Sequence, residues 1–300
     1  MKILNFGSIN IDYVYSVDHF VQAGETQSTY KREVFPGGKG LNQSIALSKA
    51  DVKVYHAGKI GKHDGQFLKE LLIESNVNAY YVKDVESPSG HTIIQVNKEG
   101  NNCILLYPGA NDLQDVEFVN EVFDNFGSND YLVLQNEINN MDLIVEKAHE
   151  KNMKIFLNPS PFNEKIETLN LNHIDYFLLN EIEASLMCNE NSDDINILIN
   201  KLRKKYPNAK FVLTLGKDGV IYFDSESIYS HGIYDVEVVD TTAAGDTFTG
   251  YFIASISKGL DIEKTLELAS IASSISVTKN GAALSIPSLN EVLNSNLNKN

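Results

Sequence analysis

Two carboxylates and a run of small residues stand together in residues 240–250, DTTAAGDTFTG. A strand-like apolar run, residues 236–239, precedes this segment, and a helical pattern opens at Asp246 and continues to residue 257. The small residues at 243–245 let another molecule approach the backbone. Their N–H groups at a helix start lack partners within the helix, and the helix dipole is positive there. The segment therefore predicts an anion site.

A carboxylate beside an anion site suits the transfer of a phosphoryl group to a hydroxyl. The amides stabilise the charged transition state, and Asp246 can take the proton of the hydroxyl. The alternative is an ordinary strand-to-helix turn in which Asp246 complements the helix dipole.

A second polar cluster, GSINID at residues 7–12, follows the first strand-like run, residues 2–6. Ligands of open α/β sheets bind beyond the carboxyl ends of the strands. Asn10 and Asp12 are two residues apart, so both can face one side of an extended segment and bind sugar hydroxyls. An Asx turn is the alternative.

A third cluster, PGGKGLN at residues 36–42, leads into a helical pattern. Its glycines, Gly38 among them, let a ligand touch the backbone, and Lys39 and Asn42 add polar groups at the helix start. A flexible turn is the alternative. The chain contains no Walker A motif and no G-x-G-x-x-G after a strand, which argues against a P-loop and a dinucleotide site.

Two further motifs each follow a predicted strand. Asn180 and Glu183 have the spacing of a helix capping box, and the functional hypothesis adds Mg²⁺ and phosphate organisation through water. Thr214, Gly216 and Gly219 can hold a nucleotide, or they can form a hairpin turn into residues 220–223.

The net charge of −15 argues against a nucleic-acid or anionic-membrane partner. A polyphosphate ligand would then need local positive potential from amides, a few basic side chains and a metal ion. No apolar run is long enough for a membrane span or a signal peptide, and Cys103 and Cys188 match no metal spacing. We expect a cytoplasmic protein with free thiols.

Strand-like runs alternate with helical patterns along most of the 300 residues. This alternation predicts an α/β fold with a mainly parallel sheet covered by helices on both faces. Three segments break it, near residues 11–17, 30–35 and 91–107, and we expect them to form a small β-sheet beside the body. Such a sheet can act as a lid that excludes water; a structural flap or a dimer surface is the alternative.

In this order, the motifs resemble those of the ribokinase/PfkB carbohydrate kinase family, over nearly the whole chain. The matching segments are GSINID 7–12, GGKGLNQ 37–43, GAND 109–112, NPSP 158–161, NEIEA 180–184, TLGKDG 214–219, DTTAAGDTFTG 240–250 and KNGAALSIP 279–287.

The resemblance implies a single ribokinase-like domain, residues 1–300, that transfers phosphate from ATP to the 5-hydroxyl of D-ribose. Asp246 would be the general base, beside an anion hole formed with Ala243, Ala244 and Gly245. The sugar would bind Asn10, Asp12, Gly38, Lys39, Asn42, Glu137 and Asp246. Asn180 and Glu183 would lie near Mg²⁺ and phosphate, and Thr214, Gly216 and Gly219 along ATP.

The resemblance further implies a homodimer formed through the lid and a monovalent-cation site, usually for K⁺. The positions that match this site are Asp240, Thr242, Ser276, Lys279, Gly281 and Ser285. Leu41, Pro36 and Tyr107-Pro108 depart from the family pattern where pocket and lid meet, which leaves the exact sugar open. A deoxyribokinase, a nucleoside or ketose kinase, and a non-catalytic sugar or nucleotide sensor are the alternatives.

Overall fold

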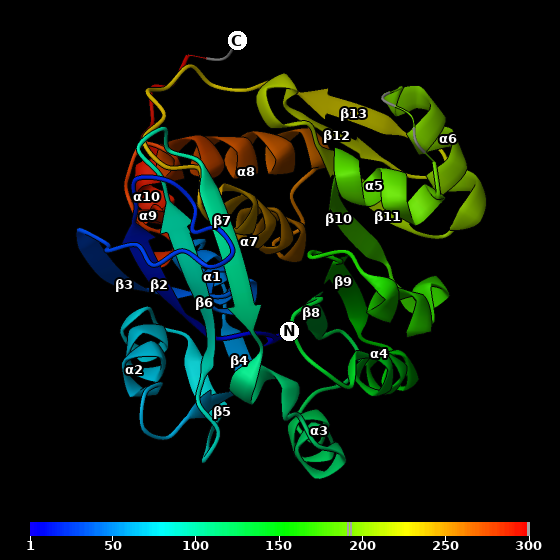
Figure 1. Ribbon diagram of the computed structural model, residues 1–300. Coiled ribbons are helices and arrows are strands. Elements are labelled where there is room, and N and C mark those ends of the chain that lie inside the picture. The colour runs from blue at the N-terminus through cyan, green and yellow to red at the C-terminus, as the bar shows by residue number, and fades with distance from the viewer. Residues whose placement is uncertain (191, 193, 299–300) are drawn as a thin grey trace.

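A nine-stranded sheet forms the centre of the computed structural model, which describes residues 1–190, 192 and 194–298 (Figure 1). Its strands, in spatial order, are β13 (Ile228–His231), β12 (Val220–Phe223), β11 (Lys210–Thr214), β10 (Tyr176–Asn180), β9 (Lys154–Asn158), β8 (Tyr131–Gln135), β1 (Ile3–Phe6), β4 (Val54–Gly61) and β5 (Asn78–Val85).

The seven strands from β11 to β5 are parallel, and β12 and β13 extend one edge as antiparallel strands. From β1 the chain first builds β4 and β5 on one side and then β8 to β11 on the other. Strand order therefore reverses at β1, and the carboxyl end of such a strand is where doubly wound sheets bind ligands.

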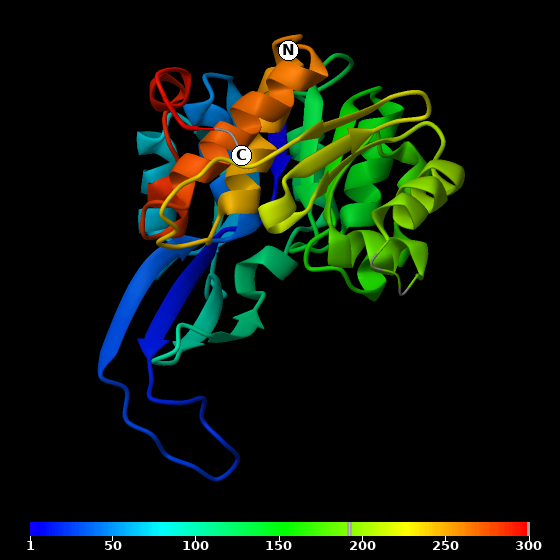
Figure 2. The ribbon, with the colours of Figure 1, turned by 90° about the horizontal axis from the view of Figure 1, so that it is seen from above.

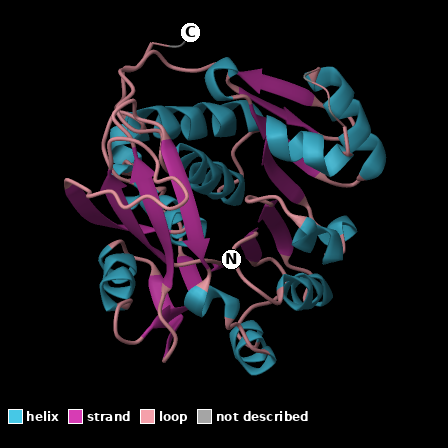
Figure 3. Ribbon diagram, viewed as in Figure 1, coloured by secondary structure: helices cyan, strands magenta, loops and turns pink. Residues whose placement is uncertain are grey.

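Helices cover both faces of this sheet (Figure 3). One face packs against α1 (Lys39–Lys49), α2 (Gln66–Glu74), α7 (Ala244–Ser257) and α8 (Ile262–Ser276). The other packs against α3 (Val116–Phe123), α4 (Met141–Glu150), α5 (Glu181–Cys188) and α6 (Ile195–Lys205). The short helices α9 (Ala282–Ser285) and α10 (Leu289–Leu293) follow α8.

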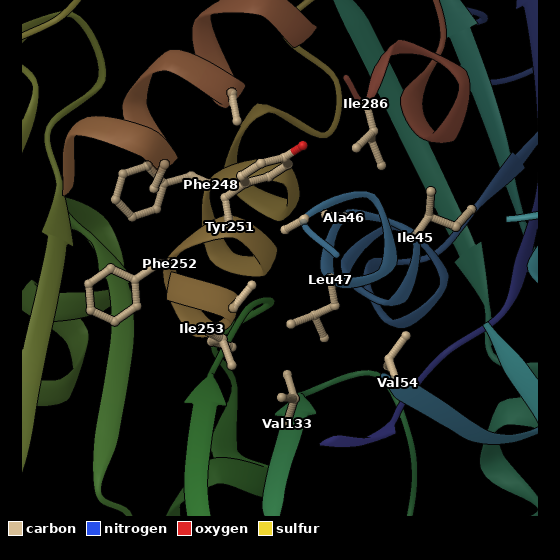
Figure 4. Close-up of a cluster of buried hydrophobic side chains, with 14 of the residues drawn as sticks. Ile45, Ala46, Leu47, Val54, Val133, Phe248, Tyr251, Phe252, Ile253 and Ile286 are labelled. Carbon is tan, nitrogen blue, oxygen red and sulfur yellow. The ribbon is translucent and has the colours of Figure 1, made fainter. Parts of the chain in front are cut away.

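Helices α1 and α7 lie side by side in the core (Figure 4). Ala46 and Leu47 of α1 face Tyr251 and Ile253 of α7, and all four are buried. A Cβ at Gly250 would lie 2.4 Å from the Cβ of Ala46, so only glycine permits this close approach.

A separate four-stranded sheet projects from the body (Figure 2). Its order is β3 (Lys31–Gly37), β2 (Asn10–Ser16), β6 (Gly90–Val96) and β7 (Asn102–Tyr107). β2 and β6 pair in parallel, whereas β3 and β7 flank them antiparallel. The predicted small sheet is therefore confirmed, and its turn at residues 97–101 is closed by the Gly100 amide on the Asn97 carbonyl.

The predicted fold class is confirmed, and most predicted elements are present within a few residues. The strand predicted for residues 236–239 is wrong: these residues form a loop in which Val238 and Val239 are more than half exposed. Helix α7 begins at Ala244, two residues before the expected start. Strands β5 and β13 were not predicted. The helical pattern of residues 192–205 predicts a helix there; residue 193 lies outside the described residues, and α6 begins at Ile195. None of the helices that the structure describes is long and apolar enough to cross a membrane.

Candidate functional site

The predicted site residues converge because five neighbouring parallel strands end on the same side. Asn10 follows β1, Glu137 follows β8, and Asn158, Asn180 and Thr214 are the last residues of β9, β10 and β11. Segments that are far apart in sequence therefore meet at the same edge of the sheet.

Asp246 lies in the first turn of α7 and is 7% exposed. Its two carboxylate oxygens each accept a hydrogen bond from α1: Asn42 Nδ2 donates to Oδ2 at 2.9 Å, and Gln43 Nε2 donates to Oδ1 at 2.9 Å. Two side-chain amides thus hold the carboxylate in place while it faces the cleft.

The backbone at the start of α7 leaves donors free beside this carboxylate. Ala243 has the left-handed φ of 61°, and the Ala244 amide donates to the Thr241 carbonyl at 3.2 Å. The hydrogen bonds of the described residues include no acceptor for the amides of Gly245 and Asp246. A Cβ built on Gly245 would meet no described atom within 4 Å, so the fold itself does not require glycine there.

Asp12 and Asn10 are positioned by the base of the small sheet. Asp12 Oδ1 accepts from Thr92 Oγ1 at 2.5 Å, and a Cβ on Gly37 would lie 2.1 Å from Asp12 Oδ2. Gly37 is therefore required for this position of the carboxylate. Burial raises the pKa of Asp12, and the neighbouring charge of Asp246 adds to the rise.

Asn10 is buried, and its Oδ1 accepts from Asn111 Nδ2 at 2.6 Å. Asn111 Oδ1 in turn accepts from the Ile9 amide at 3.0 Å. Gly38 has a φ of 91° and precedes α1, a conformation that favours glycine.

Lys39 and Glu137 meet at the start of α1. Glu137 Oε2 accepts from the Lys39 amide at 3.0 Å and from Ser8 Oγ. Burial raises the pKa of Glu137. Burial alone would lower the pKa of Lys39, but nearby carboxylates, Asp246 first, outweigh it and the net shift is upward. The ammonium therefore remains charged inside the cleft.

A cleft of about 230 Å³ extends from Lys39 and Asp246 to the motifs of the later strands, whereas Asn10, Asp12, Asn42 and Glu137 are not among its lining residues. Its lining includes Lys39, Asn180, Glu183, Thr214 and Asp246. The predicted capping box is present: Asn180 Oδ1 accepts from the Glu183 amide at 2.9 Å, and Glu183 Oε2 accepts from the Asn180 amide at 3.0 Å. Only one Glu183 oxygen is used in this way.

A larger, mainly apolar cavity of about 460 Å³ adjoins the cleft and shares Thr214 and Gly245 with it. Gly216 and Gly219 line it at the predicted hairpin, which is confirmed by the antiparallel pairing of β11 and β12. Val236 and Val238 line it from the opposite loop. The apolar run that predicted a strand thus lines a cavity wall.

Asp240 joins two of the positions that were predicted for a monovalent cation. Its Oδ1 accepts from the Thr242 amide at 2.9 Å and its Oδ2 from the Gly281 amide at 3.0 Å. Burial would raise the pKa of Asp240, but these hydrogen bonds outweigh it and the net shift is downward. An anionic carboxylate suits a hard cation.

Three other predicted cation ligands use their side chains in contacts with other parts of the protein. Ser276 Oγ donates to the Ser273 carbonyl, Ser285 Oγ donates to the Ala282 carbonyl, and the Lys279 ammonium pairs with Glu291. Lys279 can therefore contribute only a backbone carbonyl. Among the described residues, no group of three or more His, Cys, Asp or Glu side chains could hold a metal by itself.

Among the described residues, sequence reasoning missed four whose side chains hydrogen-bond the side chains of the predicted sugar-binding residues: Ser8, Gln43, Thr92 and Asn111. Ser8, Gln43 and Asn111 stand inside motifs that were singled out. What identifies them is a hydrogen bond to a residue far away in sequence, which no local spacing reveals.

The PfkB family carbohydrate kinase model matches residues 1–289. The chain belongs to this family. It is 34% identical to a ribokinase from Bacillus subtilis (97% of this chain, 98% of the relative) and 28% identical to a deoxyribokinase from Salmonella typhi (97% of each). The solved structure of Arabidopsis thaliana ribokinase complexed with ribose and ATP is similar, with a TM-score of 0.85 at 26% identity over 97% of each chain. This PfkB kinase is therefore a carbohydrate phosphotransferase with the ribokinase-like fold.

Proposed function

We propose that the chain is a ribokinase, which transfers the γ-phosphoryl group of ATP to the 5-hydroxyl of D-ribose. The observation that carries the proposal is the position of Asp246. Its buried carboxylate accepts hydrogen bonds from the side-chain amides of Asn42 and Gln43. It lies beside the backbone N–H groups of Gly245 and Asp246, which have no acceptor among the described residues. A base and an anion site at one point suit this reaction.

The sugar would lie between the small sheet and α1. Asn10, Asp12, Lys39, Asn42 and Glu137 offer donors and acceptors to its hydroxyls, together with the backbone of Gly38. Asn42 supports this assignment, because its amide oxygen is buried with no hydrogen-bond partner among the described residues. A hydroxyl of the sugar would satisfy it.

In the reaction, Asp246 would take the proton of the 5-hydroxyl as its oxygen bonds to phosphorus and the bond to the ADP oxygen breaks. The amides of Ala243, Gly245 and Asp246 would stabilise the charge on the transferred group. The Ala244 amide, which already donates to the Thr241 carbonyl, would contribute less. Positioning and charge stabilisation supply most of the catalysis in such transfers.

The two cavities fit ATP as the donor. The mainly apolar one, lined by Gly216, Gly219, Val236 and Val238, suits a planar base, and the cleft at Thr214 leads from it to Asp246. Glu183 and Asn180 would organise Mg²⁺ through water. Such a weak protein site fits Mg²⁺, which usually binds one or two carboxylates plus substrate phosphates. When bound, Mg²⁺ would neutralise phosphate charge.

Asp240, Thr242, Ser276, Lys279, Gly281 and Ser285 would hold K⁺ beside the start of α7, several of them through backbone carbonyls. The lowered pKa of Asp240 supports a cation site here, as do its hydrogen bonds from the Thr242 and Gly281 amides, which bring the loop at residues 240–242 next to Gly281.

The small sheet would close over the sugar as a lid and form a homodimer. Strand β7 is one of its two edge strands, and four apolar side chains of this strand are each about half exposed or more: Ile104, Leu105, Leu106 and Tyr107. An exposed apolar edge strand is a typical protein interface. We expect the wild type to sediment as a dimer and Leu105→Asp to sediment as a monomer.

The test is ADP release across a panel of pentoses, hexoses and nucleosides, in potassium or sodium salts. Ribokinase predicts the highest kcat/KM for ribose. A higher value for 2-deoxyribose would instead support a deoxyribokinase, an alternative that the Salmonella typhi relative favours. A nucleoside or ketose preference would reassign the sugar pocket. No ADP release with any acceptor would leave a sugar or nucleotide sensor.

A further inference from the structure

A chain of buried polar side chains lies behind Asp246. Asn5 of β1, Gln43 and Ser44 of α1, His56 of β4 and Gln135 of β8 have no solvent exposure. They lie among apolar residues of the core, where an unpaired polar group is costly. Their hydrogen bonds form one connected path.

The donor–acceptor direction of this path is fixed at one end by a backbone carbonyl. Asn5 Nδ2 donates to the Gly40 carbonyl at 2.8 Å, and a carbonyl can only accept. Asn5 Oδ1 must then accept from Gln135 Nε2, at 3.0 Å. Gln135 Nε2 also donates to Gln43 Oε1, at 2.7 Å. The remaining side of the Gln43 amide, its Nε2, is therefore the side that faces Asp246.

The other branch is oriented in the same way. Ser44 Oγ accepts from Asn5 Nδ2 at 2.9 Å, so its own proton is directed to His56 Nδ1 at 2.8 Å. His56 Nε2 then donates to the Gly7 carbonyl at 3.2 Å. Burial lowers the pKa of His56 to about 4, which keeps the ring neutral and this arrangement intact at neutral pH.

We propose that Gln43 is a positioning residue for the base, with Gln135 fixing the orientation of its amide. Gln43 and Asn42 each donate to a different oxygen of Asp246, so together they fix the rotation of the carboxylate and stabilise its charged form. This inference rests on the proposed function, since it assigns Asp246 the role of general base.

Two variants distinguish the effect of the hydrogen-bond donor of Gln43 from the effect of its side-chain shape. Gln43→Met keeps the volume and removes the donor. Gln43→Glu keeps the shape and places an acceptor against Asp246. The matched control is Gln114→Met, which removes a similarly buried amide whose Nε2, among the described residues, donates to the Ala110 and Asn111 carbonyls and to no other group.

In the kinase assay between pH 5 and 9, we expect Gln43→Met to lower kcat roughly ten- to a hundredfold, the usual cost of a misplaced catalytic group. The fall of kcat/KM at acid pH should occur at higher pH in Gln43→Met than in the wild type, because the charged carboxylate of Asp246 loses a donor. In Gln43→Glu it should occur at still higher pH, because the carboxylate also gains a like charge as its neighbour. Gln135→Met should move it in the same direction by less. A profile of Gln43→Met that overlays the wild type, or an equal shift in Gln114→Met, overturns the proposal.

A second measurement is independent of turnover. In protein labelled with ¹³C at the aspartate carboxyl, and with the Asp246 signal assigned from Asp246→Asn, this signal should titrate at higher pH in Gln43→Met than in the wild type. An unchanged titration rejects the positioning role even if no acceptor sugar is found. A shifted titration in a protein without kinase activity supports the contact and rejects the proposed function.

Discussion

Replacing Gly245 by alanine should separate stability from activity. Gly245 is the second residue of α7, and a methyl group there would meet no described atom within 4 Å. Alanine in a helix is more stable than glycine by about 0.5–1 kcal/mol. We therefore expect Gly245→Ala to unfold at a temperature roughly 1–3 °C above the wild type.

The same methyl group should impair catalysis, because the space it enters is where the proposed phosphoryl group approaches the amides of residues 243–246. Alanine keeps the backbone N–H, but displacing the phosphoryl group from the amides should cost about as much as removing one donor of an anion hole, which is about 10²–10³-fold in kcat. We expect a reduction of this order in ribose-dependent ADP release, measured with saturating sugar and ATP on the same preparation used for thermal unfolding.

Gly250→Ala is the matched control on the same helix. Its methyl group would lie 2.4 Å from the Cβ of Ala46, so the variant should lose about 1–3 kcal/mol of stability through overpacking. Its folded fraction should retain most of the wild-type kcat. Wild-type turnover by Gly245→Ala would refute the placement of the phosphoryl group at this turn.

Other outcomes follow from the same site. Asp246→Asn should lose about 10²–10⁴-fold in kcat while still binding ribose in calorimetry, and near-normal turnover would exclude it as the base. Asp12→Ala should raise KM for ribose roughly ten- to a hundredfold with a smaller change in kcat, because a sugar hydroxyl loses its partner; an unchanged KM would remove it from the sugar site. His56 takes up a proton in the unfolded chain near pH 6.5 but in the native state only near pH 4. Its contribution to stability is complete above pH 6.5 and is lost as pH falls to about 4, up to about 3 kcal/mol; urea unfolding of His56→Gln should lack this slope. Asp240→Asn should weaken activation by K⁺ over Na⁺, and equal activation ratios would count against a cation site there.

The fold could be predicted because alternation of strand and helix is a local signal. The parallel sheet, the small sheet and the capping box at Asn180 follow from spacing and residue type alone. Residues 236–239 were misjudged because valines that alternate with an acid have the same pattern whether they pair in a sheet or line a cavity wall. Strand β5 was missed because its apolar run, Ala79 to Val82, is only four residues long and is flanked by the polar Asn78 and Lys83.

The site was predictable as a set of motifs, but its internal contacts were not. Asp246 and Asn42 are 204 residues apart, and the amide path through Gln135 and Asn5 joins three different elements. A buried amide is indistinguishable in sequence from an exposed one. The two glycines of α7 also look alike in sequence, but helix packing requires Gly250, whereas a Cβ at Gly245 would meet no described atom within 4 Å.

The packing of α1 against α7 explains how a chain of net charge −15 can offer a site to a polyphosphate. Asn42 and Gln43 contact Asp246, and one turn later Ala46 and Leu47 lie against Gly250, so the two helices run in the same direction with their starts side by side. Both positive dipole ends therefore converge on the cleft. They add local positive potential beside Lys39 without a cluster of basic side chains. Gly250 permits the close approach of the two helices in the core, and the hydrogen bonds from Asn42 and Gln43 to Asp246 hold their starts together at the cleft.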